Sequence, residues 1–220
     1  MTSPAPKRKP GRPAGKTTDT SAAIRQAALD VFAQKGFDRA SIQDIALAAH
    51  VAKPLIHYHF ATKEVLWQAA VSQAQQALMA EIMTVQSMLS DLDPRVAIEL
   101  MAGKLVGFAA THPQLVRIVV EETGKGGPRA DWLMTTFLLP SYALSQALID
   151  KVSQDLKLGR NKPLAEHMVP AVLGVMNFPF LESAVIQRAF GKDVHSPSYI
   201  KRHSAVLHKV LLSFFTPNKP

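Results

Sequence analysis

The 220-residue chain contains no cysteine, and this absence excludes several kinds of protein at once. It leaves no disulfide framework, no thiolate nucleophile and no zinc site with cysteine ligands. No apolar stretch approaches the roughly 18 residues that a membrane-spanning helix needs. No apolar segment follows the basic residues at the amino terminus to form a signal peptide. We therefore expect a cytoplasmic protein that does not contact a membrane.

Acidic residues are scarce relative to basic ones, 17 against 25, and the formal net charge is +8. The excess lies at the front, because residues 1–67 hold ten Lys/Arg against five Asp/Glu, whereas residues 68–220 hold fifteen against twelve. A basic front half is typical of proteins that bind a polyanion, either nucleic acid or an anionic membrane surface. A solvated tail that only aids solubility is the simpler alternative.

Segments with the alternating pattern of strands are also absent, and helical periodicity begins near Thr20. We predict an all-α fold. Gly36 is suited to end the first helix, and Ser41 with Asp44 has capping-box spacing for the second. Pro140 and Pro179 should kink or interrupt the runs that contain them. The expected helices cover about residues 20–36, two short segments after Ser41 and around Pro54, and then 62–89, 93–112, 114–122, 129–158, 163–190 and 197–215.

Two short helices joined by a tight turn indicate a helix-turn-helix, whose last helix normally lies in the DNA major groove. The details of this segment are more specific, and they are Phe32 to Phe37, then Ser41, Ile42, Asp44, Ile45 and Ala46, then Ile56 to Phe60 with Thr62, Lys63, Glu64 and Leu66. Over roughly residues 21–67 they closely resemble the DNA-binding domain of the tetracycline-repressor (TetR) family of transcriptional regulators. The resemblance implies an N-terminal three-helix helix-turn-helix DNA-binding domain joined to a larger helical ligand-binding and dimerisation domain.

On this resemblance we expect a disordered basic tail over 1–18, the DNA-binding domain over 19–67 and the ligand-binding and dimerisation domain over 68–220. The expected protein is a homodimeric repressor on a palindromic operator in double-stranded DNA, released by a small apolar or amphipathic effector through the fourth helix. The alternative is a DNA-binding regulator without such an effector, controlled by a protein partner or constitutive. No catalytic motif is present, so an enzyme is not expected, and neither is a cofactor or metal.

The resemblance assigns DNA contacts chiefly to the start of the recognition helix. Lys53 could donate to guanine O6 or N7, whereas Leu55 can touch only apolar groups such as the thymine methyl. Lys63 matches the family's phosphate-contacting lysine. Because a cation there opposes the local helix dipole, we expect it to point outward to an anion. The expected DNA-binding residues are Arg12, Ser41, Lys53, Pro54, Leu55, His57, Tyr58, His59 and Lys63.

The sequence departs from the family pattern at three places. His57 stands where the family usually has a tyrosine, Ala40 where a threonine is common, and His50 where the turn has glycine, so His50 should adopt a left-handed conformation. His57 and His59 cannot share a metal ion, because positions i and i+2 point to different sides of a helix. For His59, helix capping or core packing stays open beside DNA contact.

Arg12 lies in the segment Pro10-Gly11-Arg12-Pro13, which is similar to the Gly-Arg-Pro core of AT-hook peptides. Such an arm places arginine in the narrow minor groove of A·T-rich DNA. The alternative is a merely solvated tail.

In the large domain, aromatic, methionine and polar residues interrupt apolar helix, and they are candidates for a pocket lining. Ordinary core packing is the alternative for each. His167 and Asn177 would be the polar anchors, and the absence of a charge cluster favours an uncharged or amphipathic ligand. The candidates are Trp132, Phe137, His167, Met176 and Asn177. The helices over 163–190 and 197–215 are expected to pair across the two-fold axis of the dimer.

Overall fold

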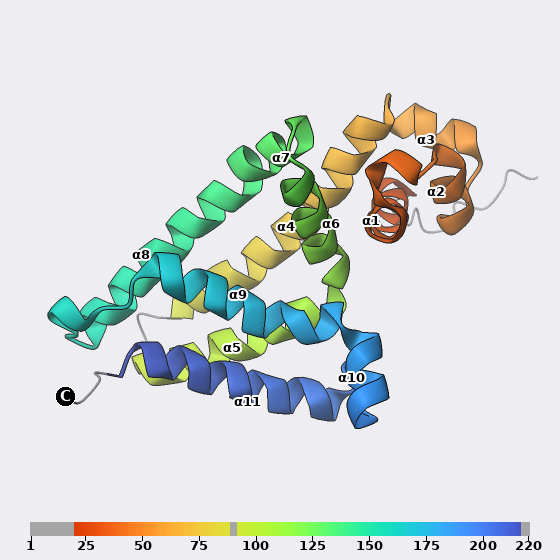
Figure 1. The fold of residues 1–220 in the computed structure, drawn as a ribbon. Coiled ribbons are helices and arrows are strands. Elements are labelled where there is room, and N and C mark those ends of the chain that lie inside the picture. Colours follow the sequence, from red (N-terminus) through yellow and green to blue (C-terminus); the bar gives the residue numbers. More distant parts are fainter. Residues whose placement is uncertain (1–19, 89–91, 217–220) are drawn as a thin grey trace, which may run out of the picture.

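The computed structural model describes residues 20–88 and 92–216, and the fold there is entirely helical, which confirms the all-α prediction (Figure 1). Helices α1 to α3 lie at one end, and α4 runs from them into the body of the molecule. The helices are α1 (Thr20–Arg39), α2 (Ile42–Ala48), α3 (Lys53–His59), α4 (Lys63–Met88), α5 (Pro94–Thr111), α6 (Pro113–Lys125), α7 (Pro128–Leu133), α8 (Leu139–Asp155), α9 (Ala165–Leu181), α10 (Ser183–Phe190) and α11 (Pro197–Phe214), with a π-helical segment η1 (Met134–Leu138) and a 3₁₀ turn η2 (Gly159–Asn161).

Local capping chemistry sets the start of α2 as predicted. At Gly36, the expected end of the first helix, the backbone is non-helical, and α1 continues beyond this kink to Arg39. The Ser41 side chain accepts a hydrogen bond from the Asp44 backbone N–H at 3.1 Å, and the Asp44 carboxylate accepts one from the Ser41 N–H at 3.0 Å. Both halves of the capping box are therefore present. His50 has φ 54°, the left-handed conformation expected of it. These features fix the turn between α2 and α3.

Side chains from other helices compensate for the two prolines that were expected to kink or interrupt their helical runs. Proline lacks an N–H, so the carbonyl four residues earlier loses its partner. For Pro140 this is the Thr136 carbonyl, which accepts from Gln75 Nε2 at 3.2 Å, and the chain passes through η1 without a break. For Pro179 it is the Val175 carbonyl, which lies 2.8 Å from His203 Nε2. The run expected over 163–190 is interrupted just after Pro179, because α9 ends at Leu181 and α10 follows at a bend of 70°.

Two apolar cores hold the molecule together. The first joins α1 to α4 with residues of α5, α6, α7 and η1, and it includes Ile24, Phe32, Trp67, Leu115 and Phe137. The second joins α5, α8, α9 and α11, where α5 and α11 lie side by side (Figure 1). The helix-turn-helix is therefore not packed on α4 alone. It also rests on α6 and on the segment that follows it.

Over the described ranges, no single helix is long and apolar enough to cross a membrane. One bent pair, α9 with α10 at 70°, passes that test by length and composition only.

Candidate DNA-binding surface and apolar cavity

Helix α3 presents almost all of its side chains to solvent. Of its seven residues only Ile56 is buried, and it is completely buried in the first core. Lys53, Pro54 and Leu55 lie exposed in the first turn, and Tyr58 is 82% exposed. A short helix anchored by one apolar residue and exposed on its remaining faces is suited to enter the major groove of DNA.

The two histidines of α3 are also exposed. His59 meets the edge of the Tyr58 ring at 5.2 Å between centroids and is tilted against Phe60 at 6.2 Å. Core packing of His59, one of the alternatives, is therefore wrong. DNA contact by His57 and His59 stays a prediction. Among the described residues, no group of three His, Asp or Glu side chains could hold a metal ion.

Ser41 is exposed, and its hydroxyl is already engaged within the capping box. It donates to the Asp44 carboxylate at 2.8 Å in addition to capping α2. Hydrogen bonds from Lys35 and then Ser41 lower the pKa of Asp44 to about 2, so the carboxylate stays ionised at neutral pH. A phosphate contact by Ser41 stays a prediction. Arg12 lies outside the described residues.

Lys63 does not point outward, and that expectation is wrong. Its Nζ donates to the backbone carbonyls of Phe37 at 2.8 Å and Ala40 at 2.9 Å, and it lies 4.4 Å from the centre of the Phe37 ring. Carbonyls at the C-terminal end of a helix lack intrahelical partners, and a cation satisfies both their hydrogen bonds and the negative end of the helix dipole. Lys63 thus joins the start of α4 to the end of α1, and its phosphate contact stays a prediction.

An apolar cavity of about 210 Å³ lies among α4, α5, η1, α8, α9 and α11. Its lining is aliphatic and aromatic except for Ser141, Tyr142 and Ser145. Both serine hydroxyls donate to carbonyls of their own helical run, Ser141 to Phe137 at 2.7 Å and Ser145 to Ser141 at 2.9 Å. Among the described residues, no Asp, Glu, Lys, Arg or His belongs to the lining. The cavity therefore suits an uncharged, mostly apolar molecule.

Two of the five residues predicted for the pocket line this cavity, namely Phe137 and Met176. The other three do not line this cavity, and ligand contact by them stays a prediction. Trp132 packs edge-on against Trp67 at 5.4 Å, His167 is exposed, and the buried Asn177 amide donates to the Leu173 carbonyl of its own helix at 2.9 Å. Of the two expected polar anchors, Asn177 is satisfied within its own helix and His167 is exposed to solvent.

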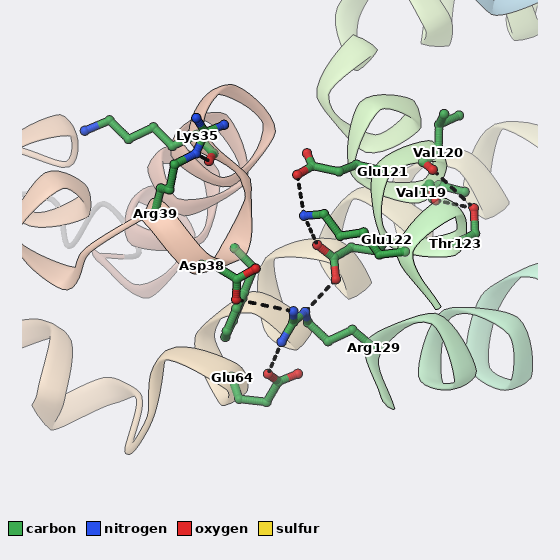
Figure 2. Close-up of polar contacts among 12 residues, drawn as sticks. Lys35, Asp38, Arg39, Glu64, Val119, Val120, Glu121, Glu122, Thr123 and Arg129 are labelled. Carbon is green, nitrogen blue, oxygen red and sulfur yellow. Dashed lines mark hydrogen bonds and ion pairs between the residues drawn. The ribbon is translucent and has the colours of Figure 1, made fainter. Parts of the chain in front are cut away.

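A cluster of charged residues that sequence reasoning missed joins α7 to the helix-turn-helix (Figure 2). The Arg129 guanidinium lies 2.6 Å from Glu122 of α6, 3.5 Å from Glu64 of α4 and 3.7 Å from Asp38 near the end of α1. Burial by itself lowers the pKa of Arg129, but the hydrogen bond to Glu122 and the surrounding carboxylates outweigh this effect and raise it. Arg129 follows a Gly-Gly-Pro segment whose composition indicates only a loop, so no local pattern marks it.

Several large apolar side chains lie exposed on the helices at the end of the chain. Phe178 of α9 is 61% exposed, and Val185 and Phe190 of α10 and Val206 of α11 are also exposed. Exposed apolar groups of this size on neighbouring elements are typical of a protein interface.

Residues 24–70 match the sequence model described as "Bacterial regulatory proteins, tetR family". Three curated relatives are similar to the chain. A probable HTH-type transcriptional regulator of Bacillus subtilis, YttP, is 23% identical over 180 residues, which are 82% of this chain and 86% of the relative. The A-factor receptor protein of Streptomyces griseus is 28% identical over 74% of this chain and 54% of its own length. The HTH-type transcriptional regulator RutR of Escherichia coli K12 is 31% identical over 48% of this chain and 49% of its own.

Solved structures share the fold at low identity. A TetR-like transcriptional regulator from Rhodococcus sp. RHA1 has a TM-score of 0.58 and 17% identity, covering 88% of this chain and 93% of the other. The fatty acid degradation regulator FadR from Bacillus halodurans has a TM-score of 0.60 and 17% identity, covering 88% and 97%.

Proposed function

Since the chain belongs to the tetR family of bacterial regulatory proteins and is a DNA-binding transcriptional regulator, we propose that it is a repressor released from its operator by a small effector. It binds a palindromic operator as a homodimer, and the effector is apolar or amphipathic. Its place of action is the cytoplasm. The division into a basic tail over 1–18, a DNA-binding domain over 19–67 and a ligand-binding and dimerisation domain over 68–220 is part of the same proposal.

The observation that carries the DNA-binding part is the exposure of α3 around its single buried residue, Ile56. Two copies of α3 related by a two-fold axis read half-sites on one face of the duplex, roughly 34–36 Å or a multiple apart on unbent DNA. The exposed apolar groups Phe178, Val185, Phe190 and Val206 support a homodimer through α9, α10 and α11.

Selection of duplexes from a random pool, followed by sequencing, tests the operator. We expect an inverted repeat, and a Lys53→Ala variant should change base preference because Lys53 is exposed at the start of α3. Lys201→Ala, which removes an exposed cation from α11, is the matched control and should leave the preference unchanged. Enriched sequences without inverted symmetry would contradict the proposal.

The effector part is supported by the cavity, whose lining, over the part of the chain that the structure describes, has no ionisable group other than Tyr142. A binding molecule places its apolar part against residues such as Leu78, Met101 and Leu144, and any strongly polar group must stay near solvent. A thermal-shift panel of aliphatic alcohols and esters, with carboxylates and quaternary amines of equal chain length, tests this. We expect the neutral compounds to raise the melting temperature more than the charged ones.

The effector acts through α4, which begins beside the DNA-binding helices and passes the cavity at Leu78, Met79 and Ile82. An effector shifts the spacing of the two recognition helices only if it favours one arrangement of this helix, since a ligand that binds both states equally shifts nothing. A second link runs from α4 to the cavity wall, because Gln75 donates to the Thr136 carbonyl in η1. The alternative, a regulator without a small-molecule effector, predicts that no compound in the panel alters DNA binding.

A further inference from the structure

We propose that Arg129 is a positioning residue that holds the DNA-binding helices in a fixed orientation on the large domain. The inference deepens the proposed function and rests on it, because orientation matters only where two recognition helices read one duplex. It concerns a residue of α7 that is not itself among the expected operator contacts, although it shares the Phe37 ring with one of them, Lys63. Three elements of the chain meet at its guanidinium (Figure 2).

The three carboxylates around Arg129 come from different parts of the fold. Glu122 belongs to α6, Glu64 to the first turn of α4, and Asp38 to the last turn of α1. A planar guanidinium presents its N–H donors in a fixed fork, so it can engage several carboxylates at defined angles. The cluster therefore constrains α1 and α4 relative to α6 in more than one direction.

The two sides of the cluster differ in strength. The Glu122 side chain is only 3% exposed and holds Arg129 at 2.6 Å, whereas Glu64 and Asp38 are 40% and 73% exposed and lie 3.5 and 3.7 Å away. A buried carboxylate needs a compensating charge, while exposed ion pairs contribute little and rearrange easily. Arg129 is thus fixed firmly to the large domain and holds the DNA-binding helices by weaker, adjustable contacts.

Arg129 also contacts an aromatic side chain of the DNA-binding helices. The Arg129 guanidinium carbon lies 3.8 Å from the centre of the Phe37 ring, close enough for a cation–π interaction. Phe37 stacks on Phe32 at 5.7 Å and meets the edge of Trp67 at 6.3 Å. Through Phe37, Arg129 therefore contacts the aromatic cluster of Phe32, Phe37 and Trp67, which joins α1 to α4.

Arg129 also lies on the segment that walls the cavity. Helix α7 continues directly into η1, where Phe137 and Leu138 line the cavity, and Phe137 belongs as well to the first core. Packed elements of this kind move as units rather than deform locally. The orientation that Arg129 sets is consequently coupled to the position of the cavity wall.

The absence of cysteine makes a direct distance measurement possible. Cysteines are introduced in the full chain at the exposed Gln43 of α2 and Gln154 of α8, and each is spin-labelled. The labelled protein is mixed with excess unlabelled protein, so that a dimer contains at most one labelled chain and the measured distance is the one between its two labels. The unsubstituted background should give a narrow distance distribution. Arg129→Ala should broaden it, and affinity for the duplex selected by the unsubstituted protein should fall by about tenfold.

Two further variants make the result decisive. Lys104→Ala removes a 2.9 Å ion pair with Glu81 inside the large domain and should leave the distribution unchanged. Arg129→Ala removes the 2.6 Å partner of the buried Glu122, leaves it only the longer 3.6 Å pair with Lys125, and so threatens folding. Asp38→Asn with Glu64→Gln removes the exposed partners instead and should broaden the distribution in the same direction. If this double variant and folded Arg129→Ala both match Lys104→Ala, the proposal is overturned. Loss of duplex binding in the unsubstituted protein would instead contradict the proposed function, since the distance measurement needs no DNA.

Discussion

Replacing Gly36 with alanine should destabilise the protein because of its backbone conformation. Gly36 has φ 73° and ψ 163° at the kink near the end of α1. This region is open essentially only to glycine, and forcing another residue into it costs about 1–3 kcal/mol. An added Cβ would also lie 2.5 Å from Glu121 Oε1, which must then turn away.

The displacement of Glu121 adds little to this cost. The atom that obstructs the Cβ is the far end of a flexible side chain, and its ion pair with Lys125 at 2.6 Å is partly exposed. Exposed pairs of this kind contribute about 0.2–1 kcal/mol. The expected loss is therefore about 1–3 kcal/mol from the backbone and at most about 1 kcal/mol from Glu121.

Thermal unfolding followed by circular dichroism measures the effect. A chain of this length loses about 2–4 °C of melting temperature for each kcal/mol. Gly103→Ala is the matched control, because Gly103 is an exposed helical residue of α5 whose Cβ would meet nothing within 4 Å. It should stabilise the protein by about 0.5–1 kcal/mol. If the two substitutions change the melting temperature in the same direction, the reasoning about Gly36 is refuted.

Three further predictions concern the helix-turn-helix. Ser41→Ala should cost about 0.5–2 kcal/mol through loss of the α2 cap, and an unchanged denaturant midpoint would contradict that role. The pKa of Asp44 is lowered to about 2 in the folded protein, so the ionised carboxylate stabilises the fold above its unfolded pKa, and this stabilisation is lost as pH falls towards 2. Asp44→Asn should therefore reduce the loss of stability between neutral pH and pH 2, measured by denaturant unfolding. Lys63→Met should lower the melting temperature, because the Phe37 and Ala40 carbonyls lose a charged donor; a flatter salt dependence of DNA binding with unchanged stability would instead restore the phosphate role.

The features that sequence reasoning predicted correctly depend on neighbouring residues. The Ser41 and Asp44 capping box, the left-handed His50 and the first-turn Pro54 are each decided within four or five positions of the chain. The all-helical class follows in the same way, since apolar residues recur at helical spacing within each segment. These local preferences agree with the tertiary fold.

The features that it missed depend on residues far apart in the chain. The Val175 carbonyl, which Pro179 leaves without a donor in its own helix, is satisfied by His203 from another helix. Lys63 turns inward to carbonyls more than twenty positions earlier, and Arg129 meets Asp38 and Glu64 only in the folded chain. The pocket candidates were chosen by residue type, which does not reveal that Asn177 is satisfied within its own helix. These partners are determined by how the helices pack in three dimensions, and the spacing of residues along the sequence does not reveal them.

A reciprocal titration tests the central claim most directly. The neutral aliphatic compound that gives the largest thermal shift is titrated by calorimetry into the protein with and without the selected operator duplex, and the duplex is titrated with and without the compound. Linkage requires that each ligand weaken the other by the same factor, for which we expect at least about fivefold. A compound whose affinity is unchanged by DNA would leave the protein a DNA-binding regulator but contradict its release by an effector in this cavity.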